Sequence, residues 1–163
     1  MLDAPKVRQK QQNIYKMIPQ EIAALQSVSQ AVAKSGLEPE ILELVKLRAS
    51  QLNGCAFCLQ MHATDARKLH MSEEKLQLLA AWHEAPVYSA RERAALAWTE
   101  SLTLIAQERH GVADDVYAAV SAVFSEAELA HLTAAVGLIN VWNRFAIAYR
   151  FTPMVAAANS QAA

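Results

Sequence analysis

The chain has two cysteines, Cys55 and Cys58, and a histidine, His62, follows four residues after the second. The pair Asn53-Gly54 directly precedes them, and such a pair often ends a helix because glycine takes the left-handed conformation without steric cost. The residues that follow read as a new helix, about 55–69, with Cys55 at its start and Cys58 one turn further on. Positions i and i+4 share a helix face, so Cys58 and His62 are expected side by side.

This arrangement favours thiol chemistry. Unpaired N–H groups and the helix dipole stabilise a negative charge at a helix start, which makes a thiol there more acidic. An imidazole with an unperturbed pKa of about 6.5 can hold the thiol proton or stabilise the thiolate. The helix dipole stabilises a thiolate at both cysteines, and more strongly at Cys55, which lies at the helix start. His62, however, lies nearer Cys58. We assign the first reaction to Cys58, because a proton acceptor in contact outweighs a dipole that both thiols share.

Other interpretations of the cysteine pair are a metal site and two buried, inert side chains. Haem attachment requires a histidine directly after the second cysteine, where this chain has Leu59. A structural zinc site needs four ligands; His62 supplies a third, and the remaining histidines are too scattered to indicate a fourth: His70, His83, His110 and His131. From the chain alone, Glu43 is expected in a surface ion pair with Lys46, and His62 has a second possible partner in Asp65.

Size and composition indicate a single globular domain over residues 1–163, with a core of about 10–150 and loosely ordered ends. A net charge of −1 gives no electrostatic indication of a surface that binds nucleic acid or anionic membranes. The first ten residues lack the apolar segment of a signal peptide, and Asn140, Asn143 and Arg144 interrupt the most apolar late stretch, so no membrane span is expected. We therefore expect a cytoplasmic protein, where paired cysteines are more often catalytic or metal-binding than structural.

The elements around the cysteines are predicted to be helical throughout. Glycine and proline are few, 4 and 5 residues, and no stretch alternates with a period of two. Ser89 with Glu92, and Ser125 with Glu128, form capping-box patterns that begin two helices. The predicted helices are about 9–17, 20–34, 38–52, 55–69, 73–83, 90–108, 113–123 and 126–150. Trp82, Trp98 and Trp142 are expected in the core.

The last predicted helix is apolar on more than one face, which indicates burial on nearly all sides. Burial against a second copy of the chain predicts a homo-oligomer, and burial at the centre of a monomer is the alternative.

The spacing of Glu43, Cys55-x-x-Cys58 and His62 resembles the active-site signature of the alkylhydroperoxidase D-like proteins of the carboxymuconolactone decarboxylase superfamily. The resemblance extends over residues of about 10 to 150, and the phrases that carry it are Leu42–Cys58, Arg91–Glu100 and Ile139–Ala146. It differs at one point: the alkylhydroperoxidase has a histidine directly before its second cysteine, where this chain has Phe57. The lactone decarboxylases of the superfamily lack the cysteine pair, which argues against that activity here.

The resemblance implies an all-α alkylhydroperoxidase D-like fold, trimers or hexamers, and thiol-dependent reduction of hydroperoxides by an external dithiol. It implies that Cys58 is the peroxidatic thiol, that Cys55 resolves it, and that Glu43 and His62 relay protons. No cofactor, bound metal, nucleic-acid partner or membrane partner is expected. The alternative is a redox-sensing or metal-binding oligomer with little turnover.

Overall fold

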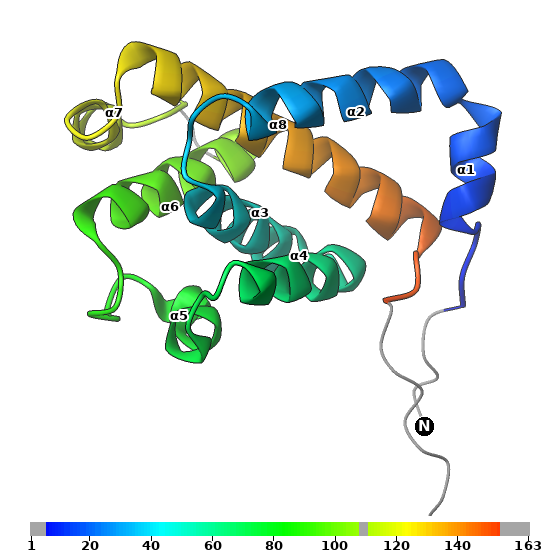
Figure 1. Ribbon diagram of the computed structural model, residues 1–163, viewed down its shortest axis with the longest axis horizontal. Coiled ribbons are helices and arrows are strands. Elements are labelled where there is room, and N and C mark those ends of the chain that lie inside the picture. The colour runs from blue at the N-terminus through cyan, green and yellow to red at the C-terminus, as the bar shows by residue number, and fades with distance from the viewer. Residues whose placement is uncertain (1–5, 108–110, 154–163) are drawn as a thin grey trace, which may run out of the picture.

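The computed structural model describes residues 6–107 and 111–153, and within these ranges every regular element is a helix (Figure 1). The predicted all-α class is confirmed. The loosely ordered ends predicted from the sequence fall mostly on residues 1–5 and 154–163, outside the described residues. The helices are α1 (Gln11–Met17), α2 (Pro19–Ala33), α3 (Pro39–Asn53), α4 (Ala56–Lys68), α5 (Glu73–Leu78), α6 (Ala90–Thr103), α7 (Asp114–Ser121) and α8 (Glu126–Tyr149), with 3-10 turns η1 (Leu79–Ala81) and η2 (Ile105–Gln107).

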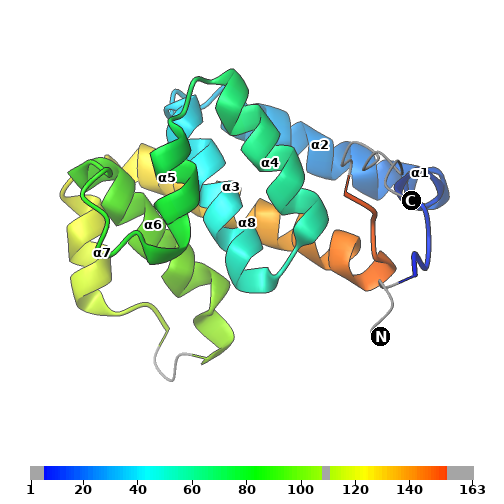
Figure 2. The ribbon, with the colours of Figure 1, turned by 90° about the horizontal axis from the view of Figure 1, so that it is seen from below.

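Helix α3 lies at the centre and packs on α4, α6 and α8 (Figure 2). It can do so because its apolar residues face two separate parts of the core. Leu42 and Val45 pack with residues of α2, α6, α7 and α8, whereas Leu44 and Leu47 pack with residues of α4, η1 and α6. A helix that is buried on both sides also buries its polar side chains, and this is the setting in which Glu43 lies.

Two predicted helices are shorter than expected. In place of the single helix predicted over 73–83, the chain forms the short α-helix α5 followed by the 3-10 turn η1. A 3-10 turn places residues i and i+3 on the same side of the turn. Leu79 and Trp82 have that spacing, and both are buried. The helix predicted over 90–108 ends at Thr103, followed by η2, where β-branched Thr103 and Ile105 are weak helix formers. Residue 108 lies outside the described residues.

Both predicted capping boxes are present. At the start of α6, the Ser89 hydroxyl accepts the Glu92 N–H, and the Glu92 carboxylate accepts the Ser89 N–H. The same reciprocal pair begins α8 with Ser125 and Glu128. Each box pairs N–H groups that no helical carbonyl can reach, so these two starts are specified locally.

Helix α8 is not buried on all sides within one chain. Its buried face carries Leu132, Val136 and Ile139, whereas Val141 and Ile147 remain 37% and 42% exposed. Burial of the whole helix at the centre of a monomer is therefore wrong, and association of copies through the exposed face stays a prediction. Across the described residues, no helix combines the length and the apolar character needed to cross a membrane.

Candidate active site

The two cysteines follow a tight turn between α3 and α4. Gly54 takes a left-handed conformation with φ of 71° and its N–H donates to the Gln51 carbonyl, while the Cys55 N–H donates to the Ser50 carbonyl at 2.9 Å. These two bonds form a Schellman motif, which confirms the helix end predicted from Asn53-Gly54. Helix α4 then begins with Cys55 as its N-cap, as predicted from the sequence.

The left-handed turn makes a first testable prediction. A Cβ at Gly54 would meet no atom within 4 Å, so Gly54→Ala should be destabilising only through backbone strain, by about 1 kcal/mol. The matched control is Gly137→Ala in α8, where a Cβ also meets nothing within 4 Å but φ is not positive. Alanine favours a helix interior, so this control should stabilise the protein by up to about 1 kcal/mol. Urea unfolding of both variants measures the difference, and shifts of the same sign would contradict it.

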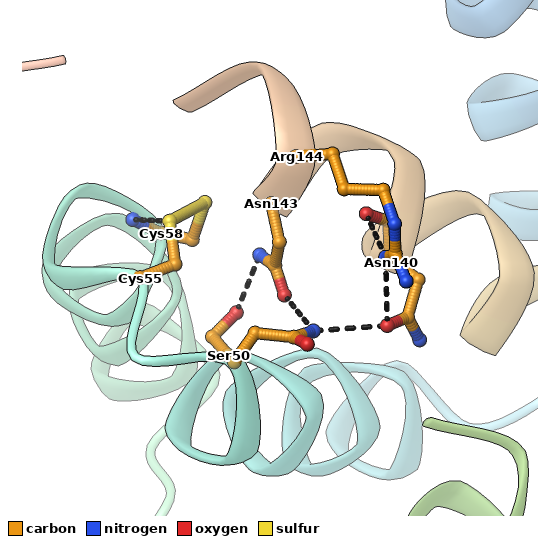
Figure 3. The surroundings of a disulfide bond; sticks show 7 residues. Ser50, Cys55, Cys58, Asn140, Asn143 and Arg144 are labelled. Carbon is orange, nitrogen blue, oxygen red and sulfur yellow. Dashed lines mark hydrogen bonds between the residues drawn. A yellow bond between two sulfur atoms is a disulfide. The ribbon is translucent and has the colours of Figure 1, made fainter. Parts of the chain in front are cut away.

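Cys55 and Cys58 are joined by a disulfide, with Cα atoms 5.4 Å apart (Figure 3). The Cys55 sulfur accepts a hydrogen bond from the Cys58 N–H at 3.3 Å. Both cysteines are almost fully buried, at 1% and 2% exposure, in a small cluster with Ile14, Ala146 and Phe151. The structure thus describes the oxidised state of the dithiol, in which neither sulfur is available as a thiolate ligand for a metal.

A partly open cavity of about 220 Å³ reaches one of the two cysteines. Cys58 and His62 of α4 line it, and Cys55 does not. Phe57 and Met61 of α4 also line it, and residues of α1, α2, α3 and α8 complete the walls. Most of the lining is apolar, with Val32, Leu42, Ile139 and Trp142 among these residues. The cavity therefore borders both Cys58, in spite of the burial of that residue, and His62.

Glu43 of α3 is buried, at 8% exposure, and its carboxylate contacts the His62 imidazole and the Lys46 ammonium group. Its Oε2 lies 2.9 Å from His62 Nδ1, and its Oε1 accepts a bond from Lys46 Nζ at 2.7 Å. The expected ion pair with Lys46 is thus present, but its expected surface position is wrong because α4 covers this side of α3. The alternative partner considered for His62 was Asp65, but His62 Nδ1 binds Glu43 instead. Asp65 accepts a bond from Lys68 Nζ.

The environment of Glu43 favours its ionised form. Burial is the largest single influence and raises the pKa of this carboxyl, but the hydrogen bond to His62 and the charge of Lys46 together outweigh it and hold the pKa below its usual value. A carboxylate beside Nδ1 accepts a hydrogen bond from the N–H of that nitrogen, and in this tautomer of the neutral ring Nε2 carries the lone pair that can accept a proton. His62, whose Nδ1 faces Glu43, is also one of the residues that line the cavity.

The structure also brings together three side chains that could ligate a metal ion, Glu43, His62 and Asp65, with donor atoms within 4.8 Å of one another. The ammonium groups of Lys46 and Lys68 already neutralise the two carboxylates, so a divalent cation would have to displace both. The zinc arrangement considered from the sequence, with both cysteines and His62, is not formed in this oxidised state.

The remaining histidines do not extend this group. His83 stacks on Trp82 and contacts Glu100, and His131 lies exposed on α8. His70 takes a left-handed conformation after α4, and His110 lies outside the described residues.

Four polar residues near the dithiol form a hydrogen-bonded group that the sequence did not predict: Ser50, Asn53, Asn140 and Asn143. Asn53 donates to Asn140 at 2.9 Å and to Asn143 at 2.8 Å, and Asn143 donates to the Ser50 hydroxyl at 3.1 Å. The sequence does show two asparagines that interrupt an apolar helix. From the sequence alone, these asparagines argue only against a membrane span. Their partners lie on α3, far away in the sequence.

The aromatic residues divide between core and cavity. Trp82 and Trp98 are buried, as expected, whereas Trp142 is only partly buried and lines the cavity. Phe57 lies edge-on against Phe151, with ring centroids 5.6 Å apart, and both line the cavity. Phe57 occupies the position at which the alkylhydroperoxidase has a histidine. In this chain the position therefore contributes an apolar wall to the cavity instead of a group that can transfer protons.

Comparisons with known proteins agree with this fold. The chain matches the carboxymuconolactone decarboxylase family over residues 19–101. It is 37% identical over 134 residues to the uncharacterized protein YdfG of Bacillus subtilis (strain 168), covering 82% of this chain and 90% of that protein. A solved structure of ATU0492 from Agrobacterium tumefaciens, a protein of unknown function described as a candidate antioxidant defence protein AhpD, has a TM-score of 0.86 at 40% identity, over 93% of this chain and 100% of that one.

A more distant solved structure has the same fold. The AhpD core of an uncharacterized peroxidase-related protein from Ralstonia eutropha JMP134 has a TM-score of 0.73 at 19% identity, over 86% of this chain and 74% of that one. At this identity the likeness concerns the fold alone.

Proposed function

Because the chain belongs to the carboxymuconolactone decarboxylase family and has the alkylhydroperoxidase D-like fold, we propose that it is a thiol-dependent peroxidase that reduces hydroperoxides through a Cys55/Cys58 dithiol–disulfide cycle. One observation carries the proposal: Cys58 and His62 line the same apolar cavity, and His62 Nδ1 is bound by the buried carboxylate of Glu43. This supplies the three things that the reaction requires, which are a reachable sulfur, a base and a group that orients the base.

In the first step, His62 Nε2 accepts the proton of the reduced Cys58 thiol while Glu43 stabilises the imidazolium that forms. The thiolate attacks the terminal oxygen of a hydroperoxide, ROOH. The O–O bond breaks, an S–O bond forms, and the alkoxide leaves with the proton that His62 held. The products are an alcohol and a sulfenic acid at Cys58.

In the second step, the Cys55 thiol attacks the sulfur of the sulfenic acid and water leaves, which forms the disulfide that the structure contains. An external dithiol then reduces this disulfide by two successive exchanges and is itself oxidised to a disulfide. The balance is ROOH plus a dithiol to ROH, water and a disulfide, with both electrons supplied by the external dithiol.

The apolar cavity predicts a preference for organic hydroperoxides. Burial of about 100 Å² of apolar substrate surface stabilises a complex by about 2.5 kcal/mol, which is more than tenfold in kcat/KM. We therefore expect cumene hydroperoxide to be reduced at least about tenfold more efficiently than hydrogen peroxide.

A cavity variant tests the cause of this preference. Ala135 of α8 lines the cavity, and Ala134 beside it is exposed. Ala135→Leu should lower kcat/KM for cumene hydroperoxide much more than for hydrogen peroxide, whereas Ala134→Leu should change neither. Equal losses with both peroxides would show that the cavity does not bind the organic group.

The second candidate function is a redox sensor with little turnover, favoured by the near-complete burial of both sulfurs. Consumption of cumene hydroperoxide in the presence of excess dithiothreitol separates the two, because an enzyme consumes many equivalents per protein and a sensor consumes one. The metal-binding alternative is tested by elemental analysis of protein that was purified without added metal. Stoichiometric metal together with single-equivalent peroxide consumption would contradict the proposed peroxidase.

A further inference from the structure

Two asparagines of α8 are aimed at the end of α3, beside the disulfide (Figure 3). Asn143 is fully buried, at 0% exposure, and so is its partner Ser50. Asn143 binds α3 at two points: its Nδ2 donates to the Ser50 hydroxyl at 3.1 Å, and its Oδ1 accepts a bond from Asn53 at 2.8 Å. Its amide thus joins two residues of the last turn of α3 to a different helix.

The same turn carries Cys55. The Ser50 carbonyl accepts the Cys55 N–H at 2.9 Å, while the Ser50 hydroxyl accepts the bond from Asn143. Asn53 is the last residue of α3 and is separated from Cys55 by Gly54 alone. The position of the Cys55 backbone therefore depends on the last turn of α3, which Asn143 binds at both Ser50 and Asn53.

A second asparagine strengthens this attachment. Asn140 accepts another bond from Asn53 at 2.9 Å, and its own amide donates to Thr103 of α6 and to the Val136 carbonyl. Arg144 contacts the Asn140 side-chain oxygen at 3.2 Å. The end of α3 is thereby fixed to α8 through side chains that are themselves held in place.

We infer that Asn143 is a positioning residue for the dithiol: by holding the turn that carries Cys55, it keeps the Cys55 sulfur within bonding reach of Cys58 and so stabilises the disulfide relative to the dithiol. Cys58 lies inside α4 and its position is set by the helix, whereas Cys55 is the N-cap and depends on the turn. Formation of an intramolecular disulfide is favoured when the two thiols are held near each other, because little conformational entropy is then lost when the S–S bond forms.

Burial of an asparagine amide supports a positioning role. A buried amide contributes little net stability even when its hydrogen bonds are made, and it is costly when they are not. Its advantage over an apolar residue is that hydrogen bonds are directional, so its bonds can form with only one geometry of the last turn of α3. The inference rests on the proposed function only in taking the dithiol as the reactive group, because the dithiol–disulfide equilibrium exists whether or not peroxide is turned over.

The test is a redox titration of the full-length protein in glutathione buffers. The protein dithiol plus oxidised glutathione gives the protein disulfide plus two molecules of reduced glutathione, with two electrons and two protons transferred. Asn143→Ala should lower the equilibrium constant for disulfide formation about tenfold, which for this two-electron couple is a potential about 30 mV more positive. Ser50→Ala, which removes one of the two bonds, should shift it in the same direction.

The matched control is Thr99→Ala. Thr99 is also 0% exposed, and its hydroxyl binds the Ala95 carbonyl of its own helix, so its loss removes a buried polar group whose hydrogen bond lies within α6. This control should leave the equilibrium constant unchanged even if it lowers stability. If Asn143→Ala does not fold, as judged by circular dichroism, Ser50→Ala decides the matter.

A constant within about twofold of the parent value in the folded variants would overturn the inference. Absence of peroxide turnover in the parent would count against the proposed function and would leave this titration unaffected.

Discussion

Replacement of Cys58 by serine is expected to abolish hydroperoxide reduction, whereas replacement of Cys55 by serine is expected to leave one turnover. Cys58 lines the cavity and Cys55 does not, so the oxygen of a bound peroxide can reach the Cys58 sulfur alone. Without Cys55, the sulfenic acid at Cys58 has no internal thiol to attack it and accumulates. Mass spectrometry after one equivalent of cumene hydroperoxide should detect one added oxygen on Cys55→Ser and none on Cys58→Ser.

The reverse assignment has a physical basis that makes this experiment decisive. The Cys55 sulfur accepts the Cys58 N–H at the start of α4, and the same donor would stabilise a thiolate at Cys55. If acidity decided the reaction, Cys55 would be oxidised first. One added oxygen on Cys58→Ser, with none on Cys55→Ser, would establish that the helix start outweighs access from the cavity.

Replacement of His62 by alanine should slow peroxide reduction by about 10²- to 10⁴-fold at neutral pH, the usual contribution of a positioned general base. Its rate should rise with pH as hydroxide removes the thiol proton in place of the imidazole. His131→Ala on the exposed side of α8 is the control and should retain the parent rate. Stopped-flow oxidation under single-turnover conditions measures this step directly, and an unchanged rate for His62→Ala would remove the histidine from the mechanism.

Glu43→Gln should cause a smaller loss, because a glutamine can still hold the His62 ring without stabilising its positive charge. The pKa of Glu43 is lower in the folded chain than its usual value of 4.5, so its ionisation contributes stability at pH above that value. This contribution disappears as the pH falls through the lower folded pKa. The stability advantage of the parent over Glu43→Gln, measured by urea unfolding, should therefore be present at pH 7 and lost in acid.

Short-range signals in the sequence determined the local architecture of the site. Asn53-Gly54 predicted the end of α3, and the two capping boxes predicted the starts of α6 and α8. Each of these features depends on hydrogen bonds between residues within a few positions of each other, so the information lies in one short stretch of chain. The same holds for Cys55 as the N-cap of its helix.

The tertiary structure decided which side chains share a site. Glu43 and His62 are 19 positions apart, and Ser50 and Asn143 are 93 apart; from the chain alone, Glu43 was expected at the surface, and the asparagines carried no expectation of contact with α3. The angles at which helices pack and the side chains that fill their contacts determine these distances, and such packing depends on residues from the whole chain. Hence the sequence identified a dithiol at a helix start, and only the packing of α1, α2, α3 and α8 around it opened the cavity to Cys58.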